Sequence, residues 1–217
     1  MNPWISIWTE PKATIAKIVA DNPNKGVWLL AWIYGFLSLM NGSQSFTLGN
    51  HLQYLLIFII SLILAPLWGM ALFAIWSWVI LMIGKMLKGQ ASFAEARAAF
   101  AWSCVPLVIN IALWVLLLIS FGGALFQTAQ PTTGPMILLM VVLMAKVVVM
   151  IWSLVIYINT LAEVQQFSVL RSIANIALAW IAIGIVVALI WMGIGFLVNA
   201  SLTPSQAVLN LTLRMQL

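Results

Sequence analysis

The sequence predicts an all-α, polytopic membrane protein with five transmembrane helices preceded by a short amphipathic interfacial helix. Of its 217 residues, 65% are hydrophobic and only 6% are charged, whereas soluble domains carry roughly a quarter charged residues. The apolar residues gather in blocks long enough to cross the ~30 Å hydrocarbon core of a bilayer. The few charged residues that remain cannot cover a soluble surface.

The apolar blocks divide the chain into three segments. Residues 1–25 are a cytoplasmic amphipathic segment, residues 26–198 a five-span transmembrane domain, and residues 199–217 a short outer C-terminal tail. The second block is too short for two crossings and a turn, so we assign it to one tilted or Pro66-kinked span. The predicted spans cover residues 26–39, 52–83, 98–121, 136–161 and 173–198.

The N-terminal segment has the pattern of an amphipathic helix. Pro11 suits the first turn of a helix, and the stretch from Asp21 to Asn24 should end it. Such a helix is expected to lie in the headgroup layer, where it either only anchors the first span or acts as a docking or curvature-sensing element. Its expected membrane-interface anchors recur at helical spacing and are Trp4, Trp8, Ile15 and Ile18.

The basic residues predict the orientation of the chain. With the N-terminus in the cytoplasm, Lys146 lies within a span, Arg214 lies outside, and the other seven of the nine Lys and Arg residues are cytoplasmic. The loops expected outside, residues 41–51 and 122–135, contain neither Lys nor Arg. This asymmetry follows the positive-inside rule. It predicts a cytoplasmic N-terminus and a C-terminus on the outer side.

The cytoplasmic connections carry a helix start and a set of charges. Ser92-Phe93-Ala94-Glu95 has the capping-box pattern, so a helix is expected to begin there and run continuously into the third span. The charges on this face form either an ion cluster between helical hairpins or a solvated boundary. They are Glu95, Arg97, Glu163 and Arg171.

A short repeat suggests that the chain contains a duplication. Ile75-Trp76-Ser77 recurs as Ile151-Trp152-Ser153, and downstream of each copy a Phe is followed by an Arg four residues later, at residues 93–97 and 167–171. Because the chain is rich in tryptophan and apolar residues, chance similarity remains open beside duplication.

One charge, Lys146, falls inside a predicted span. It lies ten residues into the fourth block, about 15 Å deep, where a lysine costs ~2.5–3.5 kcal/mol to insert. The charge is expected either to bind an anionic group or to be satisfied within the protein. Its candidate partners are Asn110, Ser103, a carbonyl near Pro106, or a lipid headgroup reached by snorkelling.

The motif search predicts that the chain is not an enzyme. The lone His51 cannot build a His-based metal site, and no HExxH, GxSxG or CxxC motif occurs. The basic residues form no stripe, which argues against nucleic-acid binding. We therefore expect neither cofactor nor metal. The expected partners are the lipid bilayer and other membrane proteins or a second copy of the chain.

The chain resembles the bacterial branch of the Yip (Ypt/Rab-interacting protein) domain family. The resemblance covers nearly the whole chain and includes Asn2-Pro3-Trp4, Pro11, Asn22-Pro23, Ser92-Phe93 and the stretch Ala101-Trp102-Ser103-Cys104-Val105-Pro106. It implies a bacterial inner-membrane protein. Eukaryotic members bind Rab GTPases and have a long acidic and aromatic cytoplasmic region before the first span. Here only about 25 residues precede the first span, so small-GTPase binding is not predicted for this chain.

Two functions follow as alternatives. The first is a non-enzymatic role in organising the membrane or binding a partner, which the resemblance and the amphipathic segment favour. The second is a small transporter or channel subunit that uses Lys146, with helices kinked at Pro66 and Pro106.

Overall fold

A computed structural model describes residues 2–128 and 133–214 and, for 133–135 and 198–214, the backbone alone. Every regular element in the described part of the chain is helical. The α-helices are α1 (Pro3–Ser6), α2 (Pro11–Asp21), α3 (Val27–Ser45), α4 (Tyr54–Met86), α5 (Phe93–Ser103), α6 (Ile109–Phe121), α7 (Thr133–Gln165) and α8 (Val169–Arg214). Short 3₁₀ turns are η1 (Leu48–Asn50), η2 (Val105–Val108) and η3 (Gly122–Phe126).

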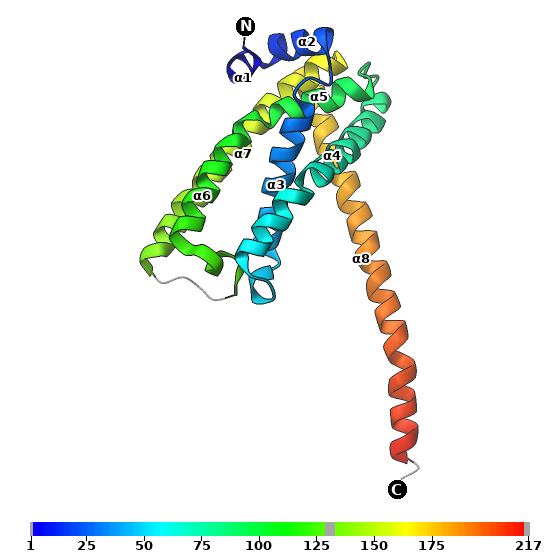
Figure 1. Ribbon diagram of the computed structural model, residues 1–217. Coiled ribbons are helices and arrows are strands. Elements are labelled where there is room, and N and C mark those ends of the chain that lie inside the picture. Colours follow the sequence, from blue (N-terminus) through cyan, green and yellow to red (C-terminus); the bar gives the residue numbers. More distant parts are fainter. Residues whose placement is uncertain (1, 129–132, 215–217) are drawn as a thin grey trace. The chain divides into compact units, whose positions relative to one another are not determined.

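The helices belong to two compact units, of which the first ends at Asn175 and the second begins at Ile176, within α8. In the first unit, α1, α2 and α5 lie at one end, and α3, α4, α6 and α7 run away from that end (Figure 1). Two large clusters of buried apolar side chains stabilise this unit. One joins the α1–α2–α5 end to the first turns of α3, and the other lies further along α3, α4 and α6.

Four helical segments are long and apolar enough to cross a membrane: Tyr54–Met86, Val105–Phe126, Met136–Gln165 and Val169–Leu197. They correspond to the second through fifth predicted spans. The first predicted span falls in α3, which is not one of the four. The reason is that α3 ends in the polar stretch Asn41-Gly42-Ser43-Gln44-Ser45, which the prediction had assigned to a loop.

The helix expected to run from Ser92 through the third span is interrupted. Its start is as predicted, because the Ser92 N–H donates to Glu95 Oε2 at 2.6 Å and the Glu95 N–H to Ser92 Oγ at 3.4 Å. However, α5 ends at Ser103 and the 3₁₀ turn η2 precedes α6. Pro106 in this turn lacks an N–H, and its ring would clash with the preceding helical turn. The prediction of a continuous helix was therefore wrong.

The N-terminal segment forms two helices instead of one. The stripe from Trp4 to Ile18 is broken between α1 and α2, and Pro11 takes the first position of α2. The predicted end at Asp21 is confirmed, with Asn22 as the C-cap. At the other end of the chain, residues 199–214, expected as a tail, continue the helix α8.

Helices α3 and α4 cross in backbone contact. A Cβ atom at Gly35 would overlap the Ala65 carbonyl and lie 2.7 Å from the Gly69 nitrogen, and a Cβ at Gly69 would overlap the Ala31 carbonyl. Each helix thus contributes two small residues spaced by four, the pattern that lets membrane helices approach closely. Glycine at both positions is required by this crossing.

A tryptophan compensates for the proline within α4. Pro66 has no N–H to donate to the Leu62 carbonyl, four residues earlier, which would leave that carbonyl unpaired. The Trp32 Nε1–H of α3 donates to the Leu62 carbonyl at 3.2 Å. The indole of α3 therefore satisfies the carbonyl that the proline of α4 leaves free.

The Trp32→Phe substitution should destabilise the protein only while Pro66 is present. It removes the indole N–H, at a cost of roughly 0.6–1.7 kcal/mol for a hydrogen bond between membrane helices. In a Pro66→Ala background the backbone donor returns, so the cost should fall toward zero. Thermal unfolding in detergent measures both. Trp68→Phe is the control, because Trp68 donates to Ser38 Oγ. An equal cost of Trp32→Phe in both backgrounds would refute the pairing.

Candidate functional site

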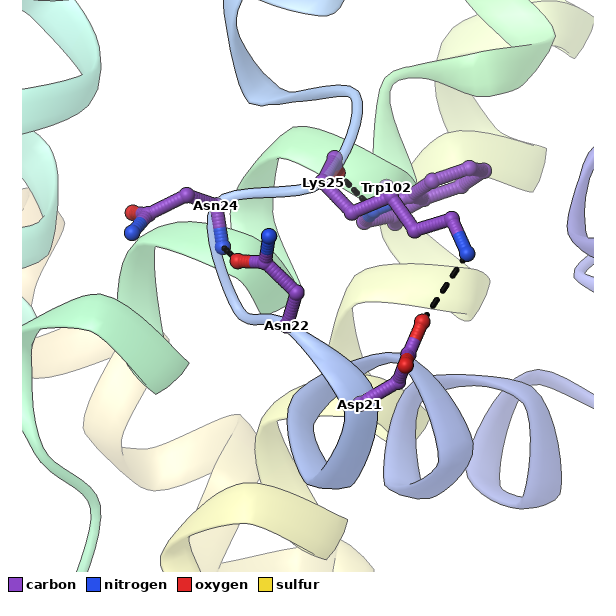
Figure 2. Close-up of polar contacts among 5 residues, drawn as sticks. All are labelled: Asp21, Asn22, Asn24, Lys25 and Trp102. Carbon is purple, nitrogen blue, oxygen red and sulfur yellow. Dashed lines mark hydrogen bonds and ion pairs between the residues drawn. The ribbon is translucent and has the colours of Figure 1, made fainter.

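Trp102 of α5 is the centre of a cluster that joins the N-terminal segment to the helices. Its side chain is 1% exposed. Its Nε1–H donates to the Lys25 carbonyl at 3.0 Å, a contact shown in Figure 2. The Trp4 ring of α1 meets it edge to face, with 5.4 Å between ring centroids. The Pro3-Trp4 and Ala101-Trp102 motifs, separated by almost 100 residues, thus meet in one contact.

The loop between α2 and α3 is shaped to receive this indole. Gly26 has a φ of +73°, in the left-handed region that favours glycine, and a Cβ there would lie 3.0 Å from the Trp102 ring. Asn22 Oδ1 accepts from the Asn24 N–H at 2.9 Å, and Lys25 pairs with Asp21 at 2.9 Å (Figure 2). These contacts within the loop stabilise its shape in addition to the contact with Trp102.

Arg97 ties the same loop to α5. Its Nη2 donates to Asn24 Oδ1 at 2.5 Å, and its guanidinium lies 5.4 Å from the centroid of the Phe93 ring. Glu95 caps the start of α5 through Ser92. In the described part of the chain, no ion pair joins any two of Glu95, Arg97, Glu163 and Arg171.

The apolar face of the N-terminal segment is buried in the protein. Ile7 and Ile15 are fully buried and Ile18 is 4% exposed, in a core that includes residues of α3, α5 and α7. Trp4 and Trp8 pack against the same core and are partly buried. All four expected anchors therefore contact protein in this structure, and their membrane-anchoring role stays a prediction.

Lys146 of α7 contacts groups that the sequence did not suggest. Its ammonium lies 4.0 Å from the centroid of the Trp114 ring on α6, a cation–π contact. Its Nζ also donates to Asn41 Oδ1 of α3 at 3.5 Å, a long and weak hydrogen bond. Asn41 was missed because it was placed in a loop. No sequence signal pointed to it, because Asn41 and Lys146 are 105 positions apart.

The other residues proposed to satisfy Lys146 have separate roles. Ser103 Oγ donates to the Phe100 carbonyl at 2.6 Å, within its own helix. Pro106 is buried in η2. Asn110 Oδ1 is buried and has no hydrogen-bond partner among the described residues, and neither does Nε1 of Trp114, one turn further along α6. The structure thus brings Lys146 to Trp114 and Asn41 instead.

The two copies of the proposed repeat share local geometry. Arg171 lies 5.6 Å from the Phe167 ring centroid, like Arg97 over Phe93. A residue with positive φ follows the end of each preceding helix, Lys88 after α4 and Gln166 after α7. That a duplication produced this likeness stays a prediction.

These observations define the class of the protein. An all-helical chain with four segments of membrane-spanning length and composition is a multi-pass transmembrane protein. A family model described as the Yip1 domain matches residues 5–192, which is most of the chain, and the protein belongs to that family. The matched range includes Trp102 and its loop. No curated protein and no solved structure matches the chain.

Proposed function

We propose that this chain is a non-enzymatic member of the bacterial branch of the Yip family that binds a membrane-protein partner, or a second copy of itself, through the face formed by α1, α2 and α5. The observation that carries the proposal is the burial of Ile7, Ile15 and Ile18 against the rest of the protein. A segment whose apolar side is occupied presents its polar side as a fixed surface. Lys12 and Ala13 are exposed on that side.

The proposed arrangement has five spans, with α3 as the first, a cytoplasmic N-terminus and an outer C-terminus in a bacterial inner membrane. The 19 residues of α3 rise about 28 Å, close to the ~30 Å of hydrocarbon. Its close crossing with α4 supports a membrane location for both helices.

This orientation predicts a thiol-labelling pattern. In a Cys104→Ser background, Ser45→Cys at the end of α3 should react with an impermeant maleimide in intact cells, because Ser45 is exposed and lies on the proposed outer side. Gln90→Cys, exposed in the connection between α4 and α5, should react only after the cells are opened. The reverse pattern would invert the proposed topology.

Site-specific photo-crosslinking of the full chain in native membranes tests the binding role. A photoreactive residue at Ala13 should give an adduct of defined mass, and Trp102→Ala should abolish it by releasing the N-terminal segment. The same probe at Ser45, at the opposite end of α3, is the matched control. If Ala13 gives only lipid adducts, α2 contacts the bilayer and the partner-binding proposal fails.

A small transporter or channel subunit is the second candidate, favoured by the contacts of Lys146. The pocket beside this region is lined only by apolar and aromatic side chains. Such a lining supports an acyl chain better than it supports a hydrated solute. We therefore rank transport below partner binding.

A further inference from the structure

We propose that Lys146, Asn41 and the groove beside Trp114 bind one anionic phospholipid, in the leaflet facing away from the N-terminal segment. The phosphate would sit at the Lys146 ammonium and one acyl chain in the groove. The choice of leaflet and the depth of the site rest on the proposed five-span arrangement, whereas the contacts of Lys146 and the groove do not.

Lys146 has no counter-ion in the described part of the chain. The chain has four acidic residues, Glu10, Asp21, Glu95 and Glu163. Glu163 lies on the same helix as Lys146 but about 26 Å along it. An unpaired ammonium in a membrane span is costly, and an anion from the bilayer would offset that cost.

The Lys146 ammonium has hydrogen-bond donors that the protein leaves unused. An ammonium has three N–H donors. The protein supplies one long hydrogen bond to Asn41 and the face of the Trp114 ring. Lys146 is half-buried and Asn41 is exposed, so the ammonium is accessible from one side. A phosphate oxygen would make a shorter, charge-assisted hydrogen bond.

The depth of the Lys146 ammonium brings it within reach of a lipid phosphate. From Val27, at the start of α3, to Asn41 the helix rises about 21 Å. If α3 crosses a hydrocarbon core of ~30 Å, Asn41 and the Lys146 ammonium beside it lie about 10 Å from the far boundary. A lysine stem and a lipid phosphate can meet across that distance by snorkelling.

A groove with a volume of about 240 Å³ lies beside Trp114. It is open and lies between α3, α4 and α6. Its lining includes Trp114, whose ring makes the cation–π contact with Lys146. Its other linings include Trp32, Phe36, Phe58 and Leu118. The lining residues of α3 precede Asn41 along the helix, so a chain in the groove would run from the level of Lys146 toward the bilayer centre.

Binding of defined lipids to the purified full-length protein tests the proposal. Dioleoyl phosphatidylglycerol and dioleoyl phosphatidylcholine share their chains and differ in net charge. Native mass spectrometry should show preferential retention of phosphatidylglycerol, and Lys146→Met should reduce this preference about fivefold, the factor equivalent to ~1 kcal/mol per basic residue near an anionic lipid surface. Lys146→Arg should keep the preference, and so should Lys12→Met, a charge-matched control on exposed α2.

A second variant tests the groove. Val115→Trp fills it from its open side, where Val115 is 50% exposed. This variant should weaken retention of both lipids while keeping the charge preference. An unchanged preference in folded Lys146→Met would overturn the proposal. Equal thermal stabilisation by inorganic phosphate would also overturn it, since that result describes a small-anion site. The Ala13 adduct does not depend on Lys146, so failure here is distinguishable from failure of the proposed function.

Discussion

Gly69→Ala is expected to destabilise the protein by at least about 1–3 kcal/mol, the usual cost of overpacking a close contact, in a thermal unfolding assay in detergent. The added methyl would overlap the Ala31 carbonyl of α3. Because the overlapped atom belongs to the backbone, no side-chain rotation can relieve the clash. The two helices must move apart, which also weakens the contacts of the core around the crossing.

Gly35→Ala should have the same effect, because it places a methyl against the Ala65 carbonyl on the other side of the crossing. The double variant should cost less than the sum, since the first substitution already separates the helices.

Gly42→Ala is the matched control on α3. Nothing lies within 4 Å of a Cβ at that position. It should be neutral or stabilise the protein by up to about 1 kcal/mol through helix propensity. If all three alanine variants behave alike, the close crossing of α3 and α4 is wrong.

The second large effect is expected for Trp102→Ala, at about 3–5 kcal/mol for a buried aromatic residue. The substitution removes the edge-to-face contact with Trp4 and leaves the Lys25 carbonyl without its indole donor. Because these contacts hold the loop before α3, the substitution should loosen the N-terminal segment in addition to lowering the free energy of unfolding of the whole protein. Hydrogen exchange of residues 2–26 should accelerate more than exchange of α4.

Trp28→Ala provides the comparison for this variant. Trp28 lies in the first turn of α3, close in sequence to the loop, but its side chain is 61% exposed. The substitution removes the same number of atoms without opening the buried cluster, so exchange in residues 2–26 should stay near that of the unmodified chain. Equal acceleration in the two variants would mean that Trp102 does not hold the N-terminal segment.

The candidate sites were only partly predictable from sequence. The capping box at Ser92 and the end of α2 at Asp21 were predictable because both depend on residues within a few positions of each other. Lys146 was identified because a charge inside an apolar block is conspicuous. Its partner Asn41 was not identified, because the two residues are 105 positions apart and only packing brings α3 beside α7.

The sequence by itself determined that this is an all-helical membrane protein. Inside a bilayer the protein itself must satisfy every backbone hydrogen bond, and a continuous apolar block of about 20 residues does so within itself as an α-helix. Composition similarly located the second through fifth spans.

Only the tertiary structure decided what the amphipathic face of the N-terminal segment contacts. Isoleucines at helical spacing are equally suited to lipid and to a protein core, because both are apolar. The choice depends on whether α5 and α7 present a complementary surface, and Trp102 supplies the contact that fixes it. Likewise, Pro66 predicts a freed carbonyl on α4, but only the crossing with α3 brings the Trp32 indole to it.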